Sequence, residues 1–147
     1  MPVTIRKSCF DPMAILRSGQ CFRMVALDER TVETITRGRR VAVRALGRGR
    51  FAFDCTPGEW EKIWKPYFDL EEDYPGIAAA APKDDAVLHR AIRCGKGLRI
   101  LRQEPWEMLV TSIITQRKNI PAIRACVETL CERYGEPVAG TERRAFP

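Results

Sequence analysis

The sequence predicts an α+β fold in which an antiparallel sheet comes first and helices follow. Two observations indicate this order. Apolar residues alternate with a period of two before residue 56, and they recur at helical spacing after it. With 147 residues, 45% of them hydrophobic and 30% charged, the chain is long enough for one core or for two small lobes that share a core.

Three short runs between residues 3 and 55 predict strands. Residues 31–35 and 40–46 alternate in polarity, and residues 50–55 form a third run. Gly38 and the segment 47–49 supply the turns between them. We expect an antiparallel meander with one polar face. Its apolar face would carry Val41, Val43, Ala45, Phe51 and Phe53.

Helices are predicted from residue 56 onward. Residues 56–59, Thr-Pro-Gly-Glu, have the order of a capping box. Asp84 or Asp85 can cap a second helix, which would run through Ile92 and end at the glycine-rich segment 95–97.

The last two predicted helices form a pair around a polar turn. Pro105 opens the first helix, Asn119 caps the second, and Gly135 and Pro137 end it. Each helix carries an apolar stripe at helical spacing, so we expect the two stripes to pack together as an αα-hairpin. The stripes are Trp106, Leu109, Val110, Ile113 and Ile114, and Ile120, Ile123, Val127, Leu130, Cys131 and Tyr134.

The turn between these helices, residues 116–119, is Gln-Arg-Lys-Asn and should lie at the exposed tip of the hairpin. With Asn119 as N-cap, we expect the first amides of the second helix to point outward, where they could meet a phosphate. Arg117 and Lys118 add positive charge beside them. The alternative is a solvated loop without a binding role.

The net charge of +6 lies entirely in the first part of the chain. Residues 1–56 contain 11 Lys/Arg against 5 Asp/Glu, whereas residues 57–147 contain 14 of each. The excess is concentrated between Arg37 and Arg50. Such arginine clusters indicate nucleic acid or another polyanion, or else solvated hairpin tips.

The cysteine and histidine pattern predicts no metal site and no cofactor. The six cysteines form no C-x-x-C pair, and His89 is the only histidine, so we expect reduced thiols in the core. The sequence contains neither an apolar run of membrane length nor a signal peptide. We therefore expect no membrane partner and a cytoplasmic protein, associated with the nucleoid if it is bacterial.

Three segments, in order, resemble the 8-oxoguanine DNA glycosylase family of the helix-hairpin-helix DNA glycosylase superfamily. Residues 98–124 are similar to its Leu-Arg-Gln-Asp/Glu-Pro entry to a buried helix and the Asn-rich turn beyond it. Residues 18–23 are similar to its Gly-Gln-x-Phe-Arg segment, and residues 67–70 to the end of its first domain. The resemblance implies a TATA-binding-protein-like antiparallel domain with a connecting helix over residues 1–70. It also implies the first helices of the all-α glycosylase domain over residues 71–147.

This resemblance implies base-excision repair by a DNA glycosylase/AP lyase that acts on oxidised purines such as 8-oxoguanine in double-stranded DNA. Gly19 would read the flipped base through its backbone carbonyl, with Gln20 and Phe22 shaping the loop. The turn would fill the gap that the base leaves. The residues assigned to that gap are Gln116, Arg117, Lys118 and Asn119.

The turn departs from the family pattern. Arg117 and Lys118 stand where the family often has Asn, and Ala122 stands where some members have an Arg facing the estranged cytosine. An arginine offers different hydrogen bonds from an asparagine, so the preference for the opposite base is left open.

No catalytic residue is assigned, because the family's nucleophilic Lys and its Asp would lie beyond residue 147, after a second hairpin. We therefore expect a chain truncated before that hairpin and inactive in base excision. We also expect an under-covered stripe at residues 106–114, with either a separate C-terminal chain or self-association covering it. Two alternatives stay open: part of an alkylated-base DNA glycosylase, and a non-catalytic DNA-binding module.

Overall fold

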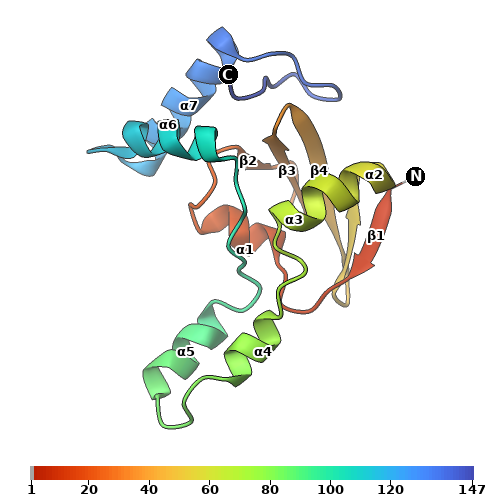
Figure 1. The fold of residues 1–147 in the computed structure, drawn as a ribbon, viewed down its shortest axis with the longest axis vertical. Helices are drawn as coiled ribbons and strands as arrows, with labels where there is room; N and C mark the ends of the chain where they lie inside the picture. Colours follow the sequence, from red (N-terminus) through yellow and green to blue (C-terminus); the bar gives the residue numbers. More distant parts are fainter. Residues whose placement is uncertain (1) are drawn as a thin grey trace.

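A five-stranded antiparallel sheet forms the first third of the computed structural model, which describes residues 2–147 (Figure 1). The strands follow the order β1-β5-β4-β3-β2, so β2 to β5 form a meander and β1 pairs with β5. The α+β class and the predicted meander are therefore confirmed. The strands are β1 Val3–Arg6, β2 Met24–Ala26, β3 Thr31–Thr36, β4 Arg39–Gly47 and β5 Arg50–Phe53.

The apolar face of the sheet forms the main core, as the alternation predicted. Val41 and Val43 of β4 are fully buried, and Phe53 of β5 stacks on Phe10 and contacts Phe68 edge to face. Complete burial of one such side chain contributes about 1.5–3 kcal/mol. A short helix, α1 (Pro12–Arg17), contacts β2 and β3 in this region.

Helix α1 was missed, because residues 3–55 were predicted to be rich in strands. Asp11 accepts hydrogen bonds from the amides of Met13 and Ala14, and Pro12 occupies the first turn. The sequence does contain this Asp-Pro start signal. The helix is only six residues long, too short for its apolar residues to show a helical period.

The prediction of one polar sheet face is wrong for β3, which is buried on both sides. The chain's last residues pass over its outer face, where Ile35 forms a small cluster with Val138 and Ala145. An isolated bridge between Pro137 and Arg144 closes this segment on itself. A strand that looks half-exposed in sequence is therefore covered by residues about 100 positions away.

A helical segment, residues 57–67, carries three aromatic side chains of the core. It comprises α2 (Pro57–Glu59), the π-helical η1 (Trp60–Trp64) and α3 (Lys65–Tyr67). The predicted capping box is present: the Glu59 amide donates to Thr56 Oγ1 at 3.2 Å, and the Thr56 amide donates to Glu59 Oε2 at 3.0 Å. Pro66 has no amide hydrogen, so an ordinary i→i−4 ladder cannot continue through it.

Helices α4 (Tyr74–Ala79) and α5 (Ala86–Cys94) project away from the sheet as a pair (Figure 1). The cap of α5 is Asp85, as the sequence allowed, whereas α4 was not predicted. Neither helix has a buried residue. The predicted domain boundary at residue 70 falls just before this pair and stays a prediction.

Helices α6 (Pro105–Thr115) and α7 (Ile120–Tyr134) pack against each other, but of the predicted α6 stripe it is Ile114 that packs against the buried cluster of α7. The stripe of α7 is buried at Ile123, Val127 and Cys131. The core-stripe prediction for α6 is wrong in this chain, because its buried residues are Glu107 and Thr111. The stripe itself is largely exposed, as we expected of an under-covered surface: Trp106 is 57%, Leu109 57% and Ile113 61% exposed.

Candidate nucleic-acid interface

The polar turn between α6 and α7 is a type II β-turn at an exposed tip. Gln116 has φ −58° and ψ 123°, Arg117 has φ +56°, and the Lys118 amide donates to the Thr115 carbonyl at 3.2 Å. A type II turn requires positive φ at its third residue, where Gly or Asn is favoured. Arg117 therefore adopts a backbone conformation that is unusual for a residue other than glycine or asparagine. Such positions cluster at functional sites.

Asn119 caps α7 as predicted, with its Oδ1 accepting from the Ala122 amide at 3.0 Å. The expected cluster of outward-pointing amides is nevertheless wrong. Pro121 has no amide hydrogen, and the Ile123 amide already donates to the Asn119 carbonyl. Only the Ile120 amide is left, so positive charge at this tip comes mainly from Arg117 and Lys118.

The Gly19 loop lies directly beside this turn. Gly19 has φ +76°, and a Cβ atom placed on it would lie 3.5 Å from Cδ1 of Ile120, the first residue of α7. No backbone hydrogen bond within residues 2–147 uses its carbonyl oxygen. The structure thus brings together two segments that are about 100 residues apart in sequence and were both predicted to contact nucleic acid.

Gln20 holds this loop to the segment before α6. Its Nε2 donates to the Arg99 carbonyl at 2.9 Å, and its Oε1 accepts from the Leu101 amide at 2.9 Å. Gln103 Nε2 donates to the Gln20 carbonyl in return. Because both ends of the side chain are engaged, Gln20 acts by positioning Gly19.

Phe22 also has an internal contact. It is half-buried and packs against the cluster of Ile123, Val127 and Cys131 on α7. Phe22 and Gln20 therefore hold the loop from two sides.

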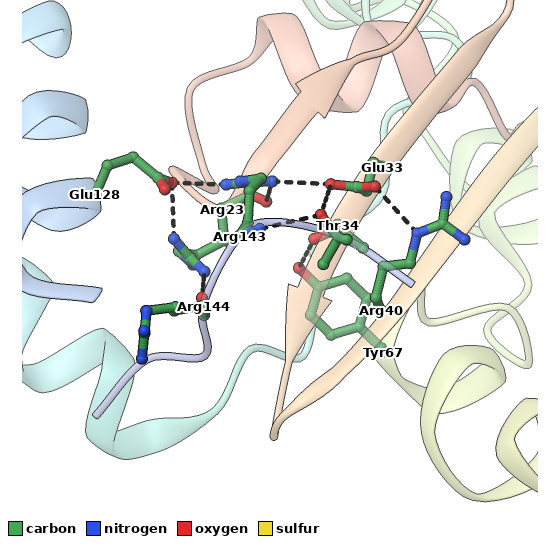
Figure 2. A network of polar contacts seen from close by, with 9 residues as sticks. Arg23, Glu33, Thr34, Arg40, Tyr67, Glu128, Arg143 and Arg144 are labelled. Atoms are coloured by element: carbon green, nitrogen blue, oxygen red, sulfur yellow. Dashed lines mark hydrogen bonds and ion pairs between the residues drawn. The ribbon is translucent and has the colours of Figure 1, made fainter. Parts of the chain in front are cut away.

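A buried polar network behind the loop was not predicted (Figure 2). Arg23 is fully buried, and its guanidinium pairs with Glu128 of α7 at 2.7 Å and donates to the Arg144 carbonyl. Arg143 bridges Glu128, at 2.6 Å, and Glu33 of β3, at 3.5 Å. The network ties the sheet, the loop, α7 and the last residues together, although the buried Nε of Arg23 has no hydrogen-bond partner within residues 2–147.

Sequence patterns could not have found this network, because its members lie on four segments with no common spacing. The one available signal was a lone arginine, Arg23, directly followed by the apolar Met24 and Val25. An arginine at the start of a buried strand needs an acidic or carbonyl partner.

Glu107 on α6 lies under the same region without a hydrogen-bond partner for its carboxylate within residues 2–147. Burial raises its pKa to about 7, against the opposing effect of the nearby Arg23 guanidinium. A carboxyl with such a pKa exchanges a proton near neutral pH.

The prediction of reduced core thiols is correct for Cys21 and Cys131, which are free and buried, but wrong for Cys94 and Cys126, which are free and exposed. Cys21 is buried and within 3.4 Å of the Tyr67 hydroxyl, and burial raises its pKa. Burial likewise raises the pKa of Cys55 and Cys131 to about 11. Thiolates are therefore disfavoured at neutral pH. Within residues 2–147, no group of side chains has the composition of a metal site, and no helix is long and apolar enough to cross a membrane.

Comparison with known proteins identifies relatives for almost the whole chain. A family model described as the N-terminal domain of 8-oxoguanine DNA glycosylase matches residues 2–109. The N-glycosylase/DNA lyase of Saccharomyces cerevisiae is 36% identical over 55 residues, which are 35% of this chain and 15% of the yeast protein.

Solved structures agree with this match. The structure of MBOgg1 in complex with a low-affinity DNA ligand has a TM-score of 0.92 and 34% identity. The match covers 99% of this chain and 51% of the MBOgg1 chain. The 8-oxoguanine glycosylase/lyase of Clostridium acetobutylicum, bound to double-stranded DNA with cytosine opposite 8-oxoG, has a TM-score of 0.87 and 29% identity. The shared part is 100% of this chain and 53% of the clostridial chain. The chain thus spans about half the length of these solved relatives.

Proposed function

The chain belongs to the 8-oxoguanine DNA glycosylase family, and from this premise we propose that it binds duplex DNA carrying an oxidised purine during base-excision repair. The observation that carries the proposal is the contact between the Gly19 loop and the start of α7. It places a free backbone carbonyl next to an exposed turn with two cations. These are the groups needed to read a base edge and to hold a phosphate backbone.

In this proposal the two segments have different tasks. The Gly19 carbonyl accepts a hydrogen bond from the flipped purine, and residues 116–119 occupy the gap in the stack. Filling that gap offsets part of the few kcal/mol lost on unstacking. The planar guanidinium of Arg117 can stack on a base and also donate to the orphan base, which an asparagine does differently.

We further propose that the 147-residue chain does not excise bases by itself. A lysine nucleophile for glycosylase/AP-lyase chemistry must lose its proton, through desolvation or through a neighbouring cation. Every lysine within residues 2–147 is exposed or only half-buried. Lys7 and Lys65 are the half-buried ones, and Lys65 pairs with Glu71 and Glu61, which raise its pKa and keep it protonated.

Exposed apolar surfaces on the helices indicate that further helices pack against them. The α6 stripe joins no core cluster within residues 2–147 except through Ile114. A groove of about 680 Å³ between α4, α5 and residues 97–100 is lined by Ile77, Leu88 and Ile92 among others. We propose that both surfaces pack against helices corresponding to the remaining length of the solved relatives, in the same or a separate chain. A cytoplasmic or nucleoid location, where DNA is available, follows from this function.

Binding of the chain to short duplexes tests the proposal. Fluorescence anisotropy would compare duplexes with 8-oxoguanine, an alkylated purine or guanine opposite cytosine, and 8-oxoguanine opposite each other base. We expect the oxidised duplex to bind most tightly. The double variant Arg117→Ala/Lys118→Ala should lower its affinity roughly tenfold at low salt, with the slope of log K against log salt smaller by about two.

The matched control is Lys83→Ala/Arg90→Ala, which removes two exposed cations from the α4–α5 region. Equal losses in both double variants, or tightest binding of the alkylated duplex, would contradict the proposal. Borohydride trapping on the same duplexes tests the second part. A trapped adduct or released lesion with this chain alone would refute the absence of excision.

A further inference from the structure

A second cluster of cations lies on the outer face of the sheet, around the β4–β5 hairpin. Arg6, Arg44, Arg48 and Arg50 are all exposed, and we refer to them as the arginine face. None of the ion pairs formed within residues 2–147 includes any of the four. Their positive charge is therefore largely presented to solvent, although the Asp28 carboxylate lies close enough to Arg44 to interact with it electrostatically.

The strand register places three of these arginines side by side. Arg6 of β1 is directly opposite Arg50 of β5, and Arg44 of β4 is opposite Ala52, two positions further along β5. Their neighbours Ile5, Phe51 and Ala45 alternate onto the inner, apolar face, so the arginines share the outer one. Like charges directly opposite each other destabilise a sheet. This arrangement is not one that stability alone would favour.

The fourth arginine lies at the tip of the same hairpin. Arg48 has φ +53° and stands between Gly47 and Gly49, which also have positive φ. A glycine or an asparagine would adopt this conformation with less strain. The hairpin thus keeps an arginine at a position that favours a smaller residue.

On the part of the outer sheet face near β3, the arginine is paired with acidic side chains. Arg40 also points outward but pairs with Glu33 at 3.0 Å and with Asp54 at 2.7 Å. The last residues of the chain cover the outer face there, at β3. The outer face is therefore neutralised and covered at one edge, and charged and open at the other.

We propose that the arginine face is a second DNA-binding surface, which contacts the phosphate backbone of a duplex segment other than the one at residues 116–119. Four exposed guanidinium groups that form no salt bridge within residues 2–147 match a row of phosphates, and they require no base sequence. The inference extends the proposed function, because it assumes that the turn already holds one duplex.

The position of the surface supports a separate segment of DNA. The β4–β5 hairpin and the end of β1 lie on the opposite side of the molecule from the α6–α7 turn (Figure 1). One chain would then hold two duplexes, or two distant stretches of one bent DNA.

A bridging experiment with the complete 147-residue chain tests this. One short duplex is fixed to beads and a second, labelled duplex is offered in solution with the protein. We expect the unchanged chain to retain the labelled duplex. The variant Arg6→Gln/Arg44→Gln/Arg50→Gln should lose this bridging, and its salt slope for total binding should fall by about three. Its thermal transition should be no lower, because like-charge repulsion is removed.

Two comparisons make the result specific. Arg90→Gln/Arg93→Gln/Arg133→Gln removes the same charge from exposed positions on α5 and α7 and should bridge normally. Arg117→Ala/Lys118→Ala should lose binding at the turn while still binding one duplex at the arginine face. The inference is overturned if the unchanged chain does not bridge or if the two triple variants behave alike. Failure of the turn variant alone to weaken binding would instead count against the proposed function.

Discussion

The sheet region and the α6–α7 region each have an apolar face that the sequence predicts, with a period of two in the sheet and helical spacing in the helices, but the two faces differ in what covers them. In the sheet region the predicted apolar residues are buried, with Val43 and Phe53 both fully inaccessible. In α6 the predicted stripe is more than half exposed at Trp106, Leu109 and Ile113, and the helix buries Glu107 instead. An apolar pattern identifies a face that avoids water, but it does not identify the segment that covers the face.

The largest expected effect is a difference in stability loss between two side-chain truncations, one in each region. We expect Phe53→Ala to lower the free energy of unfolding by about 3–5 kcal/mol, because it leaves a cavity in a complete core. Leu109→Ala should change it by less than about 0.5 kcal/mol, because the side chain is 57% exposed. Urea denaturation of both variants measures the difference. Similar losses would show that the α6 stripe is covered in solution, for example by self-association.

The buried carboxyl of α6 should make stability depend on pH. The folded-state pKa of Glu107, about 7, lies above the ordinary value of 4.5 because burial disfavours the charged form. The folded chain therefore binds the proton more tightly, and this stabilisation is complete below pH 4.5 and lost as the pH rises through 7. The full change is roughly 3 kcal/mol at about 1.36 kcal/mol per pH unit.

The substitution Glu107→Gln should remove this pH dependence and stabilise the chain above pH 7. Thermal unfolding between pH 4.5 and pH 8 would show it, with the exposed Glu132→Gln as the control. A Glu107→Gln curve that still falls in parallel with that of the unchanged chain would rule out Glu107 as the source.

Breaking the hydrogen bonds by which Gln20 joins the two regions should lower stability by a smaller amount. Gln20→Ala removes the hydrogen bonds to the Arg99 carbonyl and the Leu101 amide, and should lower stability by about 1–3 kcal/mol. The exposed Gln116→Ala, whose side chain makes no hydrogen bond within residues 2–147, should be close to neutral. Equal effects of the two glutamine variants would show that Gln20 does not join the regions.

The smallest effect should be confined to the start of α7. Asn119→Ala removes the cap on the Ala122 amide and should cost about 1 kcal/mol. Asn119→Ser should restore most of it, since a serine hydroxyl can accept the same bond. Hydrogen exchange of the first amides of α7 would detect the change. Failure of the serine variant to protect them would exclude capping as the reason.

The comparison also shows what the sequence could predict. Local signals were reliable: the capping box at residues 56–59, the Asn119 cap and the strands 40–46 and 50–55 all appear in the structure. Helices of six residues, such as α1 and α4, were missed because too few residues repeat at helical spacing. The sequence predicted the two halves of the candidate site separately. Their closeness at Gly19 and Ile120 results from the fold and has no signal in the sequence.

The buried network could not be predicted, because its members come together only when the chain has folded. Arg23 lies 105 residues from Glu128, and its position before an apolar pair indicates that it needs a partner but not which residue that partner is. The same holds for Ile35, whose cover comes from Val138 and Ala145. Long-range covering thus accounts for most of the differences between the expected and the observed molecule.

The crossing of the last residues over the sheet has a consequence for the order of synthesis. The Arg144 carbonyl that receives the Arg23 guanidinium follows it by 121 residues, and Thr141, which donates to Glu33, follows Glu33 by 108. At usual translation speeds, that interval lasts on the order of ten seconds. Until then the guanidinium stays hydrated and β3 stays open on one side. The nascent sheet is therefore accessible to chaperones and proteases until Arg144 has left the ribosome.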